Sequence, residues 1–268
     1  MTSPDLGRGV LEPGRAAAVV SLARHEPRPE VARFVEFYWL VRWDCRGRPA
    51  HEQKVLSHPN VHLVFEEPTA RLYGVDRSLF VRRLEGAGHV LGVKFRPGAF
   101  RPFVDRPVAE LADRVVPAAD VFGPDVDRVN EVVLGPDGQD GPALAARVDA
   151  FLLPRLPEPD PVAAEVAAMV EHIAATPGLS RVDQVAEACG VGVRRLQRLF
   201  HEYVGASPKW VLRRARLHEA AERADRGTDV DWAALAAELD YADQAHLTRD
   251  FTAAVGTSPA RYLETGRR

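Results

Sequence analysis

Hydrophobic positions in the first 95 residues follow the short-period pattern of β-strands. Four segments are rich in β-branched and aromatic residues and are separated by Gly, Pro and Asp, which tend to end strands. These segments are Phe34–Trp43, Asn60–Glu66, Ser78–Glu85 and His89–Phe95. Several short strands spaced in this way predict a small sandwich or barrel.

From Pro97 onward, apolar residues recur every three or four positions, which is typical of amphipathic helices. The pattern predicts helices over 97–104, 107–115, 125–134 and 142–153. The next stretch, 154–161, holds four prolines in eight residues, so it cannot continue a helix and tends to be extended. We therefore predict an α+β protein: a β-rich N-terminal domain (barrel or sandwich) with trailing helices over 1–153, a linker over 154–161, and an all-helical domain over 162–268.

One seventeen-residue pattern occurs twice in the helical part. Leu196–Leu212 and Leu247–Leu263 are related by a constant offset of 51, which carries Arg198 to Arg249 and Gly205 to Gly256. Agreement among so many unlike residue types indicates a duplicated structural unit.

The first copy predicts two helices around a tight turn. Ser180 and Asp183 resemble a capping box that starts the first helix, and the residues "CGVG" (189–192) end it. The second helix runs from about Val193 to Tyr203. It ends near Gly205, where glycine alone adopts a left-handed conformation without steric cost.

A long helix is predicted between the two copies. Ser207 caps it, Pro208 occupies its first position, and it reaches about Arg226. Its length of about 30 Å, at about 1.5 Å per residue, is close to the roughly 34 Å of one turn of B-DNA. The second copy repeats the plan, with Asp231 as a cap and a helix over 244–254. Each copy of the pattern thus belongs to a unit of two helices around a turn, and these units, about 180–205 and 231–256, are called the first and the second module.

The second helix of the first module has one apolar and one polar side. Its apolar side consists of Leu196, Leu199, Phe200 and Tyr203. Its polar stripe, at positions i, i+3, i+4 and i+7, consists of Arg194, Gln197, Arg198 and His201. Two helices around a glycine turn, the second exposing Arg and Gln, describe a helix-turn-helix for the DNA major groove. Glutamine can pair with adenine, and arginine with guanine or a phosphate.

Charge is distributed unevenly along an otherwise ordinary soluble composition. The whole chain has 46% hydrophobic and 27% charged residues, a net charge of −3 and a pI near 6.3. Between Gly190 and Arg216 seven basic residues stand against one acid, whereas between Leu217 and Asp250 three stand against nine. A local excess of cations suits a polyanionic partner. We therefore expect the first module to dominate affinity for DNA.

Residues from about 168 to 266 resemble the DNA-binding domain of AraC/XylS-type transcriptional regulators, which carries two helix-turn-helix motifs joined by a long helix. The most specific match is "YADQAHLTRDFTAAVGTSPARYL" (241–263), which is close to the signature of that family over its second motif. The resemblance implies that the N-terminal part is an effector or sensor domain. It implies base contacts from Arg194, Gln197 and Arg198, and from Gln244, His246, Thr248 and Arg249.

Two residues depart from the family pattern. Gly192 stands where a capping serine is frequent, at a loss of about a few tenths of a kcal/mol. Asp240 stands where the second turn usually has glycine, and aspartate reaches the left-handed region more readily than most residues. With nearby cations that suit phosphate contacts added, the candidate DNA-binding set is Arg194, Arg195, Gln197, Arg198, His201, Lys209, Arg213, Gln244, His246, Thr248 and Arg249.

Two other groups of residues invite a binding role in the N-terminal part. The first, which would suit a metal, is His51, His58, His62 and His89 with Glu66. It lacks the pair of histidines two residues apart that a cupin-type site uses, so we expect no metal and no other cofactor. The second is Arg96 and Arg101, which suit either an anionic effector near a helix N-terminus or ion pairs with acids across the domain.

These observations predict a cytoplasmic, sequence-specific transcriptional regulator that is not an enzyme. Cys45 and Cys189 lie far apart, which argues against a disulfide and fits a reducing compartment. Nothing approaches the about eighteen consecutive apolar residues of a membrane span. The partners expected are double-stranded DNA, a small-molecule effector and, through the N-terminal domain, a second copy of the chain. Two alternatives remain for that domain: an enzyme that carries a DNA-binding arm, or a module that binds a protein partner. Against the enzyme, the sequence has no nucleophile elbow and no phosphate-binding glycine loop.

Overall fold

The computed structural model of the chain describes residues 9–135, 140–176, 178–226 and 230–266. Within these residues, eight strands form two antiparallel sheets. The large sheet has the order β1 (Val20–His25), β2 (Val35–Asp44), β7 (Ala87–Phe95), β4 (His62–Phe65), β5 (Arg71–Tyr73), β8 (Val115–Pro117). The small sheet pairs β3 (His51–Leu56) with β6 (Leu79–Leu84). The predicted β-rich N-terminal part is confirmed, and its four predicted strands are β2, β4, β6 and β7.

Both faces of the large sheet carry apolar side chains, because successive residues of its strands alternate between a core and a cavity. On β2, Tyr38 and Leu40 point into a core that the sheet shares with the helices packed on it, whereas Phe37, Trp39 and Val41 point to the opposite face. Strands β4 and β7 divide their residues in the same way.

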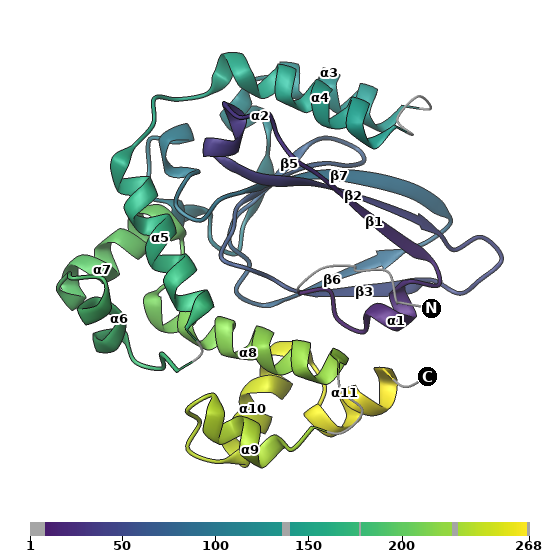
Figure 1. Cartoon of the computed structure of the whole chain (residues 1–268). Coiled ribbons are helices and arrows are strands. Elements are labelled where there is room, and N and C mark those ends of the chain that lie inside the picture. The colour runs from purple at the N-terminus through teal and green to yellow at the C-terminus, as the bar shows by residue number, and fades with distance from the viewer. Residues whose placement is uncertain (1–8, 136–139, 177, 227–229, 267–268) are drawn as a thin grey trace.

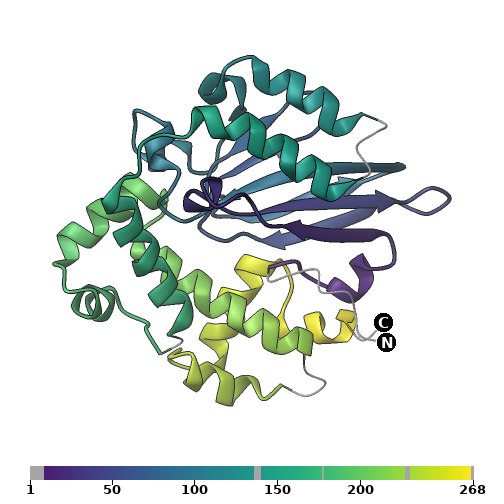
Figure 2. The same ribbon diagram turned by 45° about the horizontal axis from the view of Figure 1, so that its top comes forward.

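Helices α3 (Asp125–Leu134) and α4 (Gly141–Leu152), preceded by the short α2 (Ala119–Phe122), lie across the outer face of the large sheet (Figure 1, Figure 2). The Tyr38 hydroxyl donates a hydrogen bond of 2.7 Å to Oδ1 of the buried Asp149 and so ties α4 to the sheet. The helices predicted over 125–134 and 142–153 are therefore confirmed.

The helices predicted over 97–104 and 107–115 were wrong. These residues form only two 3-10 turns, Arg101–Phe103 and Val108–Leu111, and the start of β8. Proline prevents a continuous helix because it removes a backbone donor and clashes with the preceding turn, and three prolines fall between 97 and 107. Asp113, in the left-handed conformation with φ 57°, then turns the chain into β8.

The C-terminal part is all-helical, as predicted. It contains α5 (Pro161–Ala175), α6 (Val182–Ala188), α7 (Val193–Leu199), α8 (Pro208–Arg226), α9 (Trp232–Glu238), α10 (Gln244–Val255) and α11 (Pro259–Gly266). The first module, α6–α7, packs with α5 and the start of α8 around one core. The second module, α9–α10, packs with α11 and the end of α8 around another. Helix α8, of 19 residues, therefore links the two modules, as the sequence predicts.

The small sheet lies between the large sheet and α8 (Figure 1). Leu56 of β3 and Leu79 of β6 are partners in register, and both pack in the core of the second module together with Leu217 and Phe251. Because strand residues alternate between faces, the opposite face of the same two strands points toward the large sheet. We call β3 and β6 the shared wall.

Polar contacts also join the two parts. The Nη2 atom of Arg214, on α8, donates to the carbonyl oxygen of Arg77 at 2.9 Å, just before β6. The rings of His58 and His218 stack with centroids 3.9 Å apart.

Near the chain ends, the hydroxyl of Tyr262 on α11 accepts a hydrogen bond of 3.0 Å from the backbone N–H of Glu12, which precedes α1 (Pro13–Ala16). Residues 156–160 belong to no regular element and connect the 3-10 turn Leu153–Arg155 to α5. The proposed domain boundaries at 154 and 161 remain a prediction.

Candidate nucleic-acid interface and effector cavity

The turns of the two modules have the same backbone geometry. Gly190 has φ 64° and Asp240 has φ 54°, so both lie in the left-handed region at equivalent positions. Immediately after them, the N–H of Val191 donates to Ala186 O, and that of Tyr241 to Ala236 O, each at 2.9 Å. Aspartate therefore adopts the conformation expected of it at the second turn, and the duplication extends to individual hydrogen bonds.

The helix caps explain why these segments begin where they do. Asp231 accepts from the N–H groups of Ala233 and Ala234 at 3.0 Å, which confirms it as the cap of α9. The cap predicted from Ser180 and Asp183 was wrong. Helix α6 instead starts after Arg181, and the Gln184 side chain accepts from the backbone N–H groups of Ser180 and Arg181, at 3.1 and 3.0 Å.

The second helices of the two modules, α7 and α10, differ at their ends. Helix α7 continues into a π-helical turn, Phe200–Val204, in which the N–H of Gly205 donates to Phe200 O, five residues back. Helix α10 keeps its α-helical spacing up to Gly256, which donates to Thr252 O. Both glycines are left-handed, with φ 85° and 80°, as predicted for Gly205.

Helix α7 turns its predicted polar stripe outward. Arg194, Gln197, Arg198 and His201 are all exposed, whereas Leu196 and Phe200 are fully buried in the core of the first module. Among the described residues, Arg194 and Arg198 have no carboxylate within ion-pair distance. An exposed helix face that carries two arginines and a glutamine can enter a groove and contact bases and phosphates.

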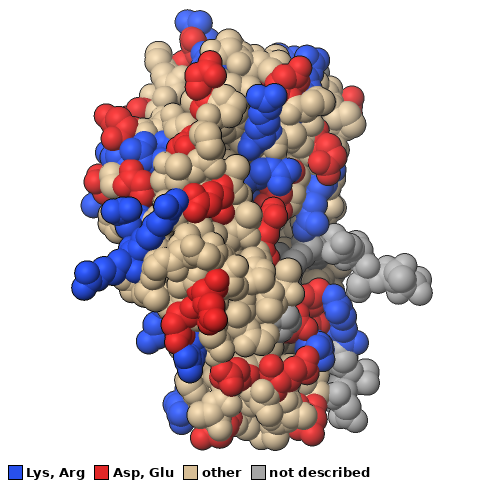
Figure 3. Space-filling view, turned by 60° about the vertical axis from the view of Figure 1, so that its left-hand side comes forward, with Lys and Arg blue, Asp and Glu red and all other residues tan. Residues whose placement is uncertain are grey.

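Not every candidate cation is equally available. Arg195 is exposed but pairs with Glu165 of α5 at 3.0 Å, and half-buried Arg213 pairs with Asp250 of α10 at 2.9 Å. Lys209 is exposed at the start of α8. Figure 3, which brings the side of α6 and α7 forward, shows basic and acidic side chains interspersed rather than one continuous basic field.

Two of the seven basic residues counted in the first module and α8 point inward. Arg214, one of these seven cations, is only 4% exposed and lies over the ring of Trp210 at 4.6 Å. Burial lowers the pKa of Arg214 to about 10. Arg216 lies over the Tyr241 ring at 4.4 Å. The local excess of positive charge facing solvent is therefore smaller than the sequence count suggests.

The candidate residues of the second module are less uniformly exposed. Gln244 and Arg249 are exposed on α10, whereas His246 and Thr248 are half-buried, with the His246 ring against Tyr241. Asp243 caps this helix by accepting from the N–H of His246 at 2.6 Å.

The acids of the second module and the end of α8 are mostly engaged in local contacts. Glu219 and Glu238 both pair with Arg223, at 2.8 and 2.7 Å, and Glu222 pairs with Arg226. Asp229, counted among these acids, lies outside the described residues. Fewer unpaired acids remain to repel phosphates than the sequence alone implies.

The N-terminal part encloses a cavity of about 250 Å³ between the large sheet and the shared wall. Its apolar lining consists of Val10, Val20, Leu22, Phe37, Trp39, Val41, Trp43, Val55, Val64, Phe80, Leu84 and Val90. Its polar and charged lining includes Arg24, Gln53, Ser57, His58, Asn60, His62, Glu66, Tyr73, Asp76, Arg82 and Lys94. A concave, mainly apolar space with a few polar groups is the usual form of a small-molecule site.

Sequence reasoning missed this cavity, although one signal was present. The sequence predicts a strand at Phe34–Trp43, and both of its alternating sets of residues contain large apolar side chains. A strand that is apolar on both faces has both faces within the protein: here helices pack on one face, and the other lines the cavity opposite the shared wall.

Buried polar groups gather at one end of the cavity. Lys94, whose side chain is 11% exposed, pairs with Glu36 at 3.0 Å. The indole N–H of Trp39 donates to Nδ1 of His62 at 3.2 Å. Burial and the nearby charge of Lys94 lower the pKa of His62 to about 3, so this imidazole is neutral and carries its proton on Nε2.

The residues considered for a metal or an anion have other contacts. Nε2 of His89 lies 2.8 Å from Val133 O, and His58 stacks on His218. No three His, Cys, Asp or Glu side chains gather into a metal-binding group in the part of the chain that the structure describes. Arg101 pairs with Glu202 of the first module at 2.6 Å, and Nε of Arg96 donates to Ala32 O at 2.7 Å.

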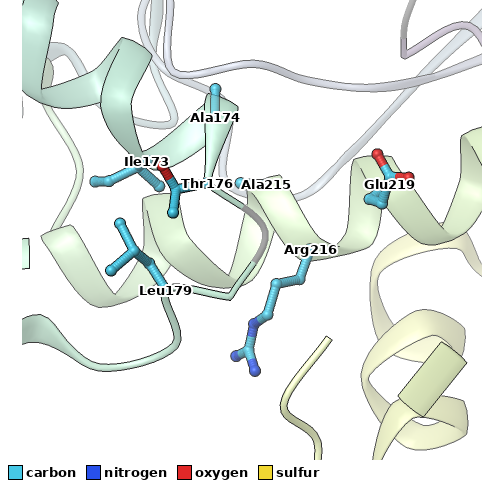
Figure 4. A pocket seen from close by; sticks show the side chains of 7 residues that line it. All are labelled: Ile173, Ala174, Thr176, Leu179, Ala215, Arg216 and Glu219. Carbon is cyan, nitrogen blue, oxygen red and sulfur yellow. The ribbon is translucent and has the colours of Figure 1, made fainter. Parts of the chain in front are cut away.

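A second pocket, between the end of α5, the following turn and α8, is too small for an effector. Its volume is about 10 Å³, which is room for about one water molecule. Figure 4 shows its lining: Ile173, Ala174, Thr176, Leu179, Ala215, Arg216 and Glu219.

Cys45 is buried and Cys189 half-buried, and neither forms a disulfide. Burial raises the pKa of the Cys189 thiol, helped by the charge of Glu165. No helix within the described residues has the length and the apolar character needed to cross a bilayer.

Comparisons with known proteins match the two parts of the chain separately. Residues 185–265 match the model of a helix-turn-helix domain, and residues 23–117 match a domain of unknown function (DUF6597). A curated relative, "Probable transcription factor PqrA" of Proteus vulgaris, is 30% identical over 86 residues, which are 32% of this chain and 70% of that protein.

Solved structures are also similar. The C-terminal domain of AraT, a response regulator from Geobacillus stearothermophilus, is 24% identical with a TM-score of 0.37, covering 40% of this chain and 88% of that one. ToxT from Vibrio cholerae is 9% identical with a TM-score of 0.42, covering 92% of this chain and 97% of that one.

Proposed function

This chain belongs to the AraC/XylS-type transcriptional regulators, and from that premise we propose how it binds DNA and responds to a ligand. Such a protein is a DNA-binding transcriptional regulator. In the proposed function, α7 and α10 contact the bases of DNA, α7 contributes most of the affinity for DNA, and the N-terminal cavity holds an effector.

The exposed face of α7 carries the first part of the proposal. Arg194 and Arg198 are exposed and without an ion pair among the described residues, and Gln197 lies between them on the same face. On α10 the equivalent face has one exposed arginine, Arg249, and its neighbour Asp250 pairs with Arg213. Because phosphate contacts supply much of the affinity of such proteins, the helix with more available cations should contribute more.

Binding to a DNA fragment selected from genomic DNA by the full chain tests this proposal. Arg198→Ala should weaken binding by about 1–3 kcal/mol, and Arg249→Ala by less. Arg147→Ala, an exposed arginine on α4 far from both modules in sequence, is the matched control and should leave affinity unchanged. An equal or larger loss with Arg249→Ala would overturn the dominance of the first module. Failure of the wild-type chain to prefer the selected fragment over scrambled DNA would overturn sequence-specific binding.

The shared wall supports an effector role for the cavity. Val55 and Phe80 are partners in register and line the cavity, while the next pair, Leu56 and Leu79, packs in the core of the second module. A molecule that fills the cavity therefore contacts strands whose other side belongs to the DNA-binding part. A ligand with different affinity for two arrangements of this wall shifts their populations and so changes DNA affinity.

The alternatives for the N-terminal part give different outcomes. An effector raises the melting temperature by mass action, is recovered unchanged, and alters affinity for DNA. Turnover of the ligand would favour an enzyme, and a melting temperature that responds only to a protein would favour a partner module. Homodimerisation, the other role proposed for this domain, is tested by light scattering of the purified chain with and without DNA.

A further inference from the structure

Cations outnumber carboxylates along the cavity: Arg24, Arg82 and Lys94 line it together with Glu66 and Asp76, and Glu36 lies beside Lys94. Glu36 has Lys94 as its partner, and Glu66 has Arg82 at 2.7 Å and Arg71 at 3.8 Å. Asp76 accepts hydrogen bonds from Ser78 and feels the charge of the buried Arg214. Each of these carboxylates therefore has at least one cation, and Glu66 has two.

Arg24 is the cation left over. Its guanidinium lies over the ring of Phe37 at 4.8 Å, and Nζ of Lys94 lies 4.9 Å from the centroid of the same ring. Among the described residues, Arg24 has no carboxylate within ion-pair distance. Two cations thus approach one aromatic ring at the cavity wall, where their mutual repulsion helps to lower the pKa of Lys94, mainly lowered by burial. An anion placed beside them would relieve both the repulsion and the desolvation.

The other end of the cavity is apolar. Trp43 on β2 lies opposite Gly88 on β7. Gly88 precedes Lys94 by six residues on the same strand, which is a distance of about 20 Å at ~3.3 Å per residue. Val20 and Leu84 line the cavity near Trp43. A ligand that extends from Lys94 toward Trp43 therefore needs a charged end and an apolar remainder.

Two glycines of β7 leave room for the indoles of Trp39 and Trp43 to lie against that strand. A Cβ added to Gly92 would lie 1.9 Å from the indole of Trp39, and one added to Gly88 would lie 2.6 Å from that of Trp43. Each indole thus lies against bare backbone of β7, which leaves flat aromatic surfaces to face a ligand. Aromatic rings stack favourably on such surfaces.

From this arrangement we infer that the cavity binds an aryl-alkyl monoanion, with its acid group beside Arg24 and Lys94 and its ring over Trp39, on the side that faces Trp43. The volume of about 250 Å³ exceeds the ~150 Å³ that holds one benzene ring, so it accommodates a ring with a short chain. This inference rests on the proposed role of the cavity as an effector site.

Three probes of nearly equal shape separate charge from hydrophobicity: phenylbutyrate, phenylbutanol and phenylbutylamine. Binding is followed by quenching of tryptophan fluorescence, since Trp39 and Trp43 line the cavity, and by the rise in melting temperature. Phenylbutyrate should bind roughly ten- to a hundredfold more tightly than phenylbutanol, as expected of charge-assisted hydrogen bonds. Phenylbutylamine should bind most weakly of the three.

Two substitutions address the acid end and one addresses the ring end. Arg24→Gln and Lys94→Gln should each weaken phenylbutyrate about tenfold while leaving phenylbutanol unchanged. Arg83→Gln is the matched control, because Arg83 is exposed beside Arg82 on β6 and pairs with Glu85. Gly92→Ala should push the Trp39 indole into the cavity and weaken phenylbutyrate and phenylbutanol alike.

Binding of the three probes tests the ligand class, whereas binding of DNA tests the proposed function. Equal or tighter binding of phenylbutanol or phenylbutylamine, or no binding of any probe, rejects the aryl-alkyl monoanion. The same preparations are tested for retention of the selected DNA fragment, so a loss of DNA binding is recognised separately as a failure of the proposed function. Binding of phenylbutyrate with no change in DNA affinity would keep the ligand class and reject the effector role.

Discussion

Leu56 is the residue at which the connection between the two parts can be tested most directly. It is fully buried, belongs to β3, and packs in a core made mostly of residues from α8 to α11. Leu56→Ala removes this contact without changing any charge. The matched control is Leu63→Ala, because Leu63 is equally buried but lies in the core between the large sheet and the helices α3 and α4.

The size of the effect follows from the burial of the side chain. Deleting a fully buried leucine side chain to alanine costs about 2–5 kcal/mol, and we take about 3 for each variant. At about 2–4 °C per kcal/mol, the value for chains of about 150–250 residues, the melting temperature of this slightly longer chain should fall by about 6–12 °C in both variants. Loss of stability alone therefore does not distinguish Leu56 from Leu63.

Hydrogen exchange distinguishes them. With Leu56→Ala, amide exchange should accelerate in α9, α10 and α11, although the substitution lies in a strand of the N-terminal part. With Leu63→Ala, it should accelerate first in β4, β7 and α3, which surround that residue. Unchanged exchange in α9–α11 of Leu56→Ala would refute the claim that the shared wall supports the second module.

Three smaller predictions concern single residues. Gly205→Ala forces a Cβ into a left-handed position, 3.1 Å from Val108, and should lower the free energy of unfolding, measured with denaturant, by about 1–2 kcal/mol. The control is Gly14→Ala, whose Cβ meets nothing within 4 Å and which should cost little. Equal stability of the two variants would contradict this prediction. Asp231→Ala removes the cap of α9 and should cost about 1 kcal/mol by the same measurement, so an unchanged midpoint would argue against the cap. Burial raises the pKa of Asp225 from 3.8 to about 6, helped by two nearby glutamates and opposed by a hydrogen bond from Tyr262. The folded state therefore binds the Asp225 proton more tightly than the unfolded state does. The stability that this proton contributes is fully present below pH 3.8 and is lost as the pH rises through about 6. Asp225→Asn should flatten the stability profile over that interval, and a profile identical to that of the wild type would reject this assignment.

Local chemistry made the C-terminal part predictable from its sequence. Turn residues, caps and helix periodicity act over a few positions, so the repeat already indicated the left-handed conformations of Gly205 and Asp240 and the cap at Asp231. The cap of α6 is an exception. Gln184, rather than Ser180, provides the cap of α6, because its longer side chain reaches back to two backbone N–H groups.

Long-range packing could not be predicted in the same way. Strand β3 has the sequence HEQKVL, whose polar and charged residues hide the fact that one face lines a cavity and the other meets a helical core. Strands β5 and β8 have three residues each, too few for a periodic pattern. Arg214 looked like one more cation on a basic helix, and only its position against β6 makes it a buried donor.

The alternation of β3 and β6 has a consequence for how such a regulator can diversify. Positions 53, 55, 80 and 82 line the cavity, while 56 and 79, next to 55 and 80 in the chain, pack in the core of the second module. Substitutions at the former set can retune chemical preference and leave the latter set intact. Under the proposed function, a lineage can thus acquire a new effector by changing every second residue of two short strands, without rebuilding the helical core of the second module.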